Sequence, residues 1–187
     1  METYEPAEDS RMLLEAAIDW LEKNAKHNMH ILDMGTGSGF VINGVKEFLY
    51  RQHIDAHLLA ADIDEVDAPN GVEFVQSDLF GSIKGRFDLV LFNPPYLPAG
   101  EDDRYLTETE RKQLIGGQKG NEVTLRFIEQ LPEHLSENGA CLLLVSSKSK
   151  PGITGNGVKK ANLRWKTMKS ESFTFEELSV FLITWPK

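Results

Sequence analysis

Residues 29–39, MHILDMGTGSG, join an apolar segment to a glycine-rich turn. Met29–Met34 has the composition of a buried strand, and Phe40–Gln52 carries apolar residues at helical spacing. A strand, a glycine turn and a helix in this order open a nucleotide-binding βαβ unit, because glycines let a ligand approach the backbone. The sequence therefore predicts an α/β fold with a parallel sheet and a ligand beside its first turn.

The glycine spacing in this turn is not that of a pyrophosphate site. Gly35, Gly37 and Gly39 follow the pattern G-x-G-x-G, whereas pyrophosphate-binding turns have G-x-G-x-x-G. The preceding Asp33 is a carboxylate, which suits an ammonium group better than a phosphate. A lone glycine turn is a weak signal, since an ordinary tight turn has the same composition. We therefore expect a ligand whose binding does not depend on a phosphate.

Acidic residues also follow the next two predicted strands. Asp62 ends one of them, where a carboxylate can accept hydrogen bonds from both hydroxyls of a ribose. Asp78 follows the strand Val72–Gln76 and is placed to accept from the exocyclic amine of an adenine, with Leu79 near the ring. Each acid alone is more often a turn or cap residue. Together with the glycine turn and its carboxylate, they predict a pocket for S-adenosylmethionine.

The tetrapeptide Asn93-Pro94-Pro95-Tyr96 closes the run Phe87–Phe92, which is continuously apolar after its single Asp. Two prolines cannot continue a sheet ladder, so the chain leaves the sheet at a strand's carboxyl end, where open α/β sheets bind ligands. An Asn side chain offers one acceptor and a two-proton donor, which complements a planar amide or amino group. Tyr96 adds a flat face for stacking. The alternative is a proline-stiffened turn without a ligand.

Taken in order, these motifs resemble a known family. The chain is similar to the HemK-like branch of class I methyltransferases, the protein-glutamine N5-methyltransferases that act on peptide-chain release factors. Within that branch it is most similar to the compact archaeal and eukaryotic form, which opens with a segment like Tyr4–Ser10. The resemblance covers the chain from Tyr4 to about Leu135 and is looser beyond. The family often has Glu at this position, and Asp33 keeps the charge of that Glu but has a shorter side chain.

The resemblance implies a fold and a set of site residues. The fold is a Rossmann-like class I methyltransferase, with a mostly parallel seven-stranded sheet, helices on both faces and an antiparallel edge strand, in a single domain over residues 1–187. The cofactor is S-adenosyl-L-methionine, and the product is S-adenosyl-L-homocysteine. Its contacts are expected at Ser10, Asp33, Gly35, Gly37, Asp62, Asp78, Leu79 and Asn93. The catalytic amide clamp is expected at Asn93, Pro94, Pro95 and Tyr96.

The clamp suggests a mechanism. The side-chain oxygen of Asn93 and the carbonyl of Pro94 would accept the two amide protons of a glutamine, which favours positive charge on the attacking nitrogen. Proximity and alignment would supply most of the acceleration. N-P-P-Y also occurs in adenine-N6 and guanine-N2 nucleic-acid methyltransferases, so methylation of a nucleic acid or of a protein lysine stays an alternative. A third interpretation is a cofactor-binding module without catalysis.

The segment Leu97–Gly120 is a long, charged connection. A connection of this length in a compact domain is usually functional or disordered, and we predict a substrate-binding flap. A solvated loop with a short helix at Glu108–Leu114 is the alternative. The family's G-G-x-x-G loop is matched by Gly116–Gly120. Its Gly-Gly-Gln repeats the tripeptide that these enzymes modify, which we regard as a coincidence.

The C-terminal third is harder to interpret. Helical spacing predicts helices at Ala7–Lys23 and Asn121–Leu135, and the last strands are expected at Leu163–Lys169 and Leu178–Trp185. The segment Lys148–Lys169, which includes the first of these strands, is rich in Gly, Pro and Asn where the fold usually has a helix. It holds seven cations and no acid in a chain of net charge −9: Lys148, Lys150, Lys159, Lys160, Arg164, Lys166 and Lys169. We expect a solvated basic loop rather than a nucleic-acid surface, because the overall acidity disfavours duplex DNA.

Composition indicates a single soluble domain. The chain has 187 residues, 41% of them hydrophobic, and no run long enough to span a membrane. The acidic N-terminus lacks the order of a signal peptide, and the single Cys141 has no zinc-ligand neighbours, so we expect no metal site and a cytoplasmic location, or a nuclear one in a eukaryote. The resemblance implies a class I release factor as substrate and a small zinc-binding activator protein as partner. That partner would add a strand beside Val72–Gln76, with Phe74 as a contact.

Overall fold

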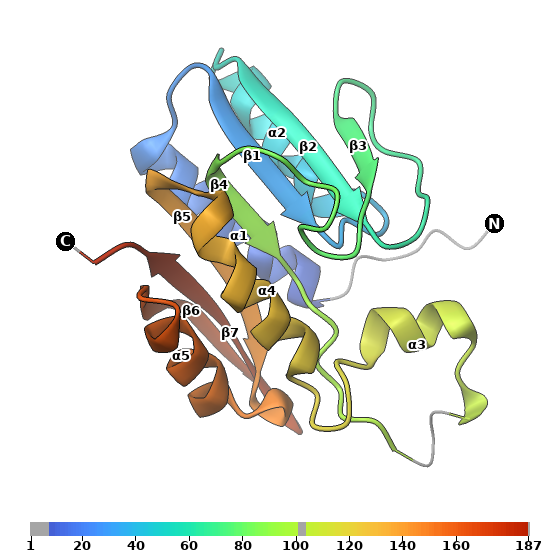
Figure 1. The fold of residues 1–187 in the computed structure, drawn as a ribbon. Coiled ribbons are helices and arrows are strands. Elements are labelled where there is room, and N and C mark those ends of the chain that lie inside the picture. The colour runs from blue at the N-terminus through green and yellow to red at the C-terminus, as the bar shows by residue number, and fades with distance from the viewer. Residues whose placement is uncertain (1–7, 101–103, 187) are drawn as a thin grey trace.

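The computed structural model describes residues 8–100 and 104–186. A seven-stranded sheet lies between two layers of helices, with α1 and α2 on one face and α4 and α5 on the other (Figure 1). The part of the opening motif before Glu8 lies outside the described residues. The predicted α/β architecture with helices on both faces is therefore confirmed.

The strand order is β3-β2-β1-β4-β5-β7-β6, in which β1 to β5 pair in parallel and β7 is antiparallel to both of its neighbours. The strands are β1 (Met29–Met34), β2 (Ala56–Asp62), β3 (Glu73–Gln76), β4 (Phe87–Phe92), β5 (Leu135–Ser146), β6 (Arg164–Phe173) and β7 (Glu176–Thr184). The helices are α1 (Glu8–Asn24), α2 (Phe40–Arg51), α3 (Glu108–Leu114), α4 (Glu122–His134) and α5 (Pro151–Lys160), with a short 3-10 turn η2 (Ser147–Ser149). The expected mostly parallel sheet with an antiparallel end is observed.

Each face of the sheet has its own apolar core. One core joins α1 and α2 to the sheet and includes Leu13, Val45 and Leu142. The other joins α4 and α5 to the opposite face and includes Phe127, whose ring packs against that of Phe92 at 4.5 Å. Because β4 is covered on both faces, it needs apolar residues throughout, which explains its continuous apolar run.

The strand order reverses beside β1, and this places three strand ends together. β1 pairs with β2 on one side and with β4 on the other, with Met34 opposite both Ala61 and Phe92. Parallel strands in this register end at the same edge of the sheet. The crevice at such a reversal is where open α/β sheets bind ligands, so the glycine turn, Asp62 and Asn93 are brought to one place.

The prediction of a basic loop at Lys148–Lys169 was wrong. This region forms η2, α5 and the first part of β6. Pro151 stands in the first turn of α5, where a helix tolerates proline. Gly155 and Gly157 permit close packing, because a Cβ would lie 2.6 Å from the ring of Trp165 at the former and 2.8 Å from Leu125 at the latter. These residues suggested a loop, although they serve helix packing.

Candidate functional site

The glycine turn after β1 is open toward the carboxyl edge of the sheet. Gly37 has a φ of 52°, in the left-handed region that side chains rarely adopt. A Cβ added there would meet no atom within 4 Å. Glycine at this position is therefore explained by backbone conformation, and it leaves free space in which a ligand can approach the main chain.

Asp33 lies under this turn and is almost fully buried. Its carboxylate accepts a hydrogen bond of 2.7 Å from the hydroxyl of Thr36. Burial raises the pKa of Asp33 to about 7, against the lowering effect of that bond. A buried carboxyl group of this kind is ready to pair with a cation that enters the crevice, since pairing would restore the ionised form.

Asp62 is fixed at the end of β2. One carboxylate oxygen accepts from the backbone N–H of Gly37 at 2.9 Å, and the other accepts from the N–H of Asp64 at 3.1 Å. The side chain is thus tied to the glycine turn, 25 residues earlier in the chain. Because each carboxylate oxygen can accept a second bond, Asp62 keeps acceptor capacity for a diol.

Asp78 and Leu79 occupy the loop after β3. The Asp78 carboxylate is half exposed and contacts the guanidinium of Arg126 on α4 at 2.7 Å. Leu79 is buried with a φ of 51°, an uncommon conformation for a residue with a branched side chain. Its carbonyl accepts from the hydroxyl of Ser77 at 2.7 Å, which holds the loop in this shape. Backbone strain of this kind concentrates at ligand sites.

Asn93 follows β4 with its side chain directed between α1 and the strand end. Its Nδ2 lies 3.5 Å from the hydroxyl of Ser10, at the long end of hydrogen-bond distances. Its Oδ1 is buried and has no hydrogen-bond partner within residues 8–100 and 104–186. A buried acceptor without a donor costs about 1–3 kcal/mol. The site therefore has a place prepared for an incoming N–H group.

Tyr96 closes the other side of the crevice. It is half buried against the core under α1, and burial raises the pKa of its phenol, with further contributions from the carboxylates of Asp9 and Glu176. The phenol therefore stays neutral at physiological pH. The two carboxylates also make the electrostatic surroundings of Tyr96 favourable for positive charge.

The end of the segment Leu97–Gly120 is hydrogen-bonded to its own start and packs against the N-P-P-Y backbone. The N–H of Leu97 donates to the carbonyl of Leu114 at 2.8 Å, and the N–H of Gly116 donates to the carbonyl of Leu97 at 2.9 Å. A Cβ on Gly116 would collide with the Pro95 carbonyl oxygen, and one on Gly120 would collide with that of Tyr96. The G-G-x-x-G loop thus needs glycine in order to support the clamp.

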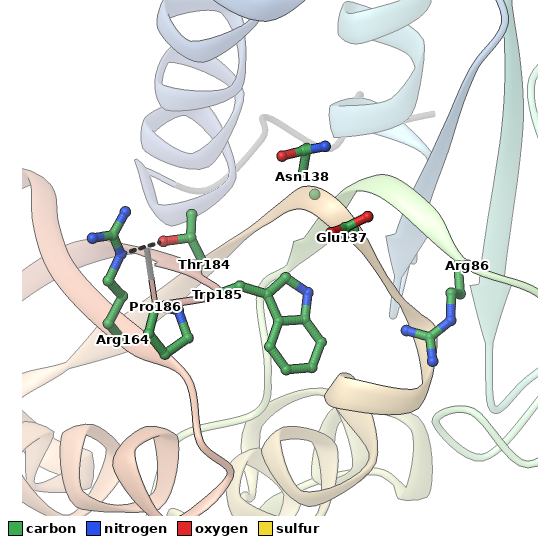
Figure 2. Close-up of a pocket in the computed structure, with 8 residues that line it drawn as sticks. Arg86, Glu137, Asn138, Arg164, Thr184, Trp185 and Pro186 are labelled. Atoms are coloured by element: carbon green, nitrogen blue, oxygen red, sulfur yellow. Dashed lines mark hydrogen bonds between the residues drawn. The ribbon is translucent and has the colours of Figure 1, made fainter.

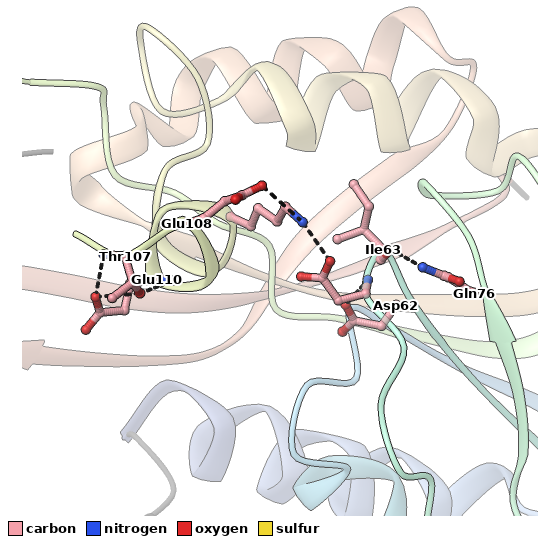
Figure 3. Close-up of polar contacts among 8 residues, drawn as sticks. Asp62, Ile63, Gln76, Thr107, Glu108 and Glu110 are labelled. Atoms are coloured by element: carbon pink, nitrogen blue, oxygen red, sulfur yellow. Dashed lines mark hydrogen bonds and ion pairs between the residues drawn. The ribbon is translucent and has the colours of Figure 1, made fainter. Parts of the chain in front are cut away.

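Helix α3 connects this segment to the ribose side of the crevice. Its Lys112 forms an ion pair of 2.7 Å with Asp64, two residues beyond Asp62, and a longer one of 4.0 Å with Glu108 (Figure 3). Thr107 and Glu110 form a capping box at its start. No side chain of α3 is buried, so the helix extends from the body of the protein, as Figure 1 also shows.

An open hollow of about 660 Å³ lies at the amino-terminal ends of the parallel strands, away from the glycine turn (Figure 2). It is lined by Arg86, Glu137, Asn138, Gly139, Arg164, Thr184, Trp185 and Pro186. These residues precede β4 or belong to the amino-terminal half of β5 and the paired ends of β6 and β7. The hollow is therefore separate from the site residues that the motifs predict.

Most of the predicted site residues meet at one edge of the sheet. Hydrogen bonds join Gly37 to Asp62 and Asn93 to Ser10, and the strand registers place these two pairs at the same end of the sheet. Asp78 is joined instead to Arg126 on α4. The sequence did not single out Thr36 or Glu176. Thr36 could have been found from its place three residues after Asp33. Glu176 had no local signal, because only the pairing of β7 with β5 brings it to this edge.

No family model matches the chain, but individual proteins do. A Methanocaldococcus jannaschii protein named as a protein N5-glutamine methyltransferase is 34% identical over 190 residues, which cover 96% of this chain and 90% of the relative. The release factor glutamine methyltransferase of Haemophilus influenzae is 30% identical over 75% of this chain, which spans about half of that protein (55%).

Solved structures agree on the fold. The chain resembles the structure of the E. cuniculi Mtq2–Trm112 complex, described as responsible for methylation of the eRF1 termination factor, with a TM-score of 0.74, 24% identity and full coverage of both chains. It also resembles the T. thermophilus 16S rRNA N2 G1207 methyltransferase with AdoMet and guanosine, with a TM-score of 0.67, 16% identity and coverage of 100% of this chain and 45% of that one.

The strand order and the solved structures define the fold of the class I methyltransferases. Within that class, the chain belongs to the protein N5-glutamine methyltransferases, the HemK-like family that its motifs resemble. The family predicted from the sequence is thereby confirmed. The roles of the individual site residues stay predictions.

Burial of Asp33 predicts a pH effect on stability. Its folded-state pKa lies above the ordinary value, so the protonated form is favoured in the fold, and stability is lost as the pH rises from about 4 to about 7. Relative to Asp33→Asn, the unliganded protein should lose about 4 kcal/mol of unfolding free energy over this range. Urea denaturation at several pH values measures it, with the exposed Asp55→Asn as control. Parallel pH profiles for wild type and Asp33→Asn would contradict the assignment.

Proposed function

We propose that this chain methylates the side-chain amide nitrogen of the glutamine in the Gly-Gly-Gln motif of a class I peptide-chain release factor. The observation that carries the proposal is the buried Oδ1 of Asn93 at the carboxyl end of β4, which has no hydrogen-bond partner among the described residues. A primary amide has two N–H donors in one plane, and Asn93 Oδ1 could accept one of them. The printed functions of the relatives, release factor glutamine methyltransferase and methylation of eRF1, support the choice of substrate.

The residues of the crevice fit S-adenosylmethionine as the cofactor. Asp33 would pair with its ammonium group, Asp62 would accept from the ribose hydroxyls, and Asp78 with Leu79 would bind the adenine. The backbone at Gly37 leaves the space that such an approach needs. When bound, the cofactor supplies an activated methyl group. Ser10 would contribute from α1, beside Asn93.

The chain's own residues would orient and activate the amide. Asn93 Oδ1 and the Pro94 carbonyl accept one amide proton each, which fixes the amide plane and presents the nitrogen to the cofactor side. The Pro95 carbonyl is covered by Gly116, so it is not the second acceptor. The carboxylates of Asp9 and Glu176, which act on Tyr96, favour positive charge as it develops on the nitrogen. The methylated nitrogen is then acidic enough to lose its proton to solvent.

We further propose that the edge strand β3 binds a small zinc-binding activator protein by adding a strand to the sheet. Among the described residues, β3 pairs only with β2, which leaves its other side without a strand partner there. The Mtq2 structure that resembles this chain is a complex with Trm112, which supports a partner of this kind.

In the part of the chain that the structure describes, no helix is long and apolar enough to cross a membrane. A translation factor as substrate implies that the enzyme works in the cytoplasm.

Mass spectrometry of methyl transfer tests the proposed substrate. The chain, S-adenosylmethionine, the activator protein and the release factor should give a gain of one methyl group on the Gly-Gly-Gln glutamine. The gain should disappear when this glutamine is replaced by asparagine, whose shorter side chain does not reach the clamp. Transfer to another residue, or none from a chain that binds the cofactor, would contradict the proposal.

Asn93→Ala should reduce kcat for methyl transfer by at least about 100-fold, because one acceptor of the clamp is lost. Cofactor affinity, measured by calorimetry, should change by less than about fivefold, because the cofactor's main contacts lie elsewhere. Asn138→Ala, at the opposite edge of the sheet, is the matched control and should leave both values unchanged. Equal loss of turnover and cofactor affinity would count against the clamp role.

Phe74→Asp should weaken binding of the activator protein at least about tenfold, because a charge would be buried at the new strand pairing. The measurement is calorimetric titration of the activator into each variant, with retained cofactor binding as the check on folding. Thr167→Pro on β6, the other edge strand, is the control. The partner assignment fails if the β6 variant loses the activator and the β3 variant keeps it.

A further inference from the structure

Phe175 is an unusual residue at the tip of the β6–β7 hairpin. Phe173 pairs with Glu176, so only Thr174 and Phe175 form the loop. The Phe175 side chain is 89% exposed. Two-residue hairpin loops favour Asn, Asp and Gly, because the usual turns need positive φ angles, and an aromatic side chain gives no advantage there. Neither the turn nor the core explains a phenylalanine at this position.

A single exposed aromatic is common on protein surfaces, so the place of Phe175 in the fold matters. Within the described residues, the exposed large hydrophobic side chains are Tyr50, Ile63, Tyr105, Leu114, Ile153 and Phe175. The β6–β7 hairpin reaches the carboxyl end of β5, where Ser146 pairs with Leu178. Phe175 therefore lies at the end of the sheet where the parallel strand β4 leads into the N-P-P-Y motif.

The hairpin is held firmly beside the crevice. The carboxylate of Glu176 accepts from the hydroxyl of Ser146 and pairs with the ammonium of Lys148 at 3.3 Å. The N–H of Glu177 donates to the hydroxyl of Ser147 at 3.0 Å. Tyr96 and Phe173 pack against the same apolar core. A tip that is fixed at its base can present Phe175 at little cost in conformational entropy on binding.

The proposed substrate motif needs such a surface. In Gly-Gly-Gln the two glycines have no side chain, and the glutamine side chain enters the clamp. Affinity and choice of glutamine must therefore come from contacts outside the tripeptide. Binding of the activator protein does not explain an exposed Phe175. The activator is proposed to bind β3, whereas Phe175 lies in the β6–β7 hairpin, and β3 and β6 are the two outermost strands on opposite sides of the sheet.

We propose that Phe175 anchors the folded domain of the protein substrate, by inserting into an apolar depression next to the loop that carries the glutamine. The inference rests on the proposed function and adds to it a residue that selects the substrate. Phe175 acts on binding of the whole domain and has no part in methyl transfer. Its contribution should thus appear in KM for a folded substrate and be absent for a short peptide.

The test compares Phe175→Ala with Tyr50→Ala in the full chain with its activator. Tyr50 is an exposed aromatic residue near the end of α2, outside the β6–β7 hairpin. With the folded release-factor domain, Phe175→Ala should raise KM about tenfold, as expected for an aromatic anchor, and leave kcat within about twofold. With a short peptide containing Gly-Gly-Gln, kcat/KM should be unchanged. Phe175→Trp should restore most of the affinity for the domain, and Tyr50→Ala should behave as wild type.

An unchanged KM for the domain, or an equal loss on domain and peptide, would overturn the inference. Thermal unfolding of the variant checks that folding is intact, which is expected because the side chain is exposed. Wild-type turnover separates the two proposals. If wild type fails to methylate the domain, the proposed function fails, and calorimetric binding of the domain to Phe175→Ala and wild type then decides whether the hairpin still binds it. Equal binding would overturn the anchor role.

Discussion

The parallel pairing of β1 with β2 and β4 is the constraint on which the site depends. Because Met34 lies opposite both Ala61 and Phe92, the residues just beyond these strands share one edge. The bond from Gly37 to Asp62 then locks the glycine turn to the second strand end. A change in register by one residue would turn the side chains of β4 to the other face and move Asn93 out of the crevice.

The electrostatics of the crevice suit the transfer of a cationic methyl group to a neutral nitrogen. Asp33 is buried, and burial raises its pKa to about 7, so pairing with a cation would favour its ionised form. Asp9 and Glu176 surround a phenol that stays neutral. In the proposed clamp, Asn93 Oδ1 has no hydrogen-bond partner among the described residues. The glycine loop packs against the N-P-P-Y backbone so closely that a side chain at Gly116 or Gly120 would collide with it.

Features encoded within one short segment could be predicted from the sequence, and those created by long-range packing could not. The glycine turn and the continuous apolar β4 were predicted correctly. The helix Glu108–Leu114 was only the alternative to a substrate-binding flap, and the flap stays a prediction. The helix α5 was missed, because Gly155 and Gly157 are helix-breaking in isolation and are needed only for contact with Trp165 and Leu125. The ion pair of Asp78 with Arg126 and the approach of Glu176 to Tyr96 likewise depend on the folded arrangement of distant segments.

The most direct test is a crystal structure of the chain with S-adenosylhomocysteine and a peptide containing Gly-Gly-Gln. The account predicts that the glutamine side-chain nitrogen lies at about 2.8–3.2 Å from Asn93 Oδ1, within hydrogen-bond distance, and faces the cofactor sulfur. It also predicts that the Pro94 carbonyl accepts the second N–H. A glutamine amide bound elsewhere, or Asn93 Oδ1 occupied by a donor of the protein itself, would contradict the account.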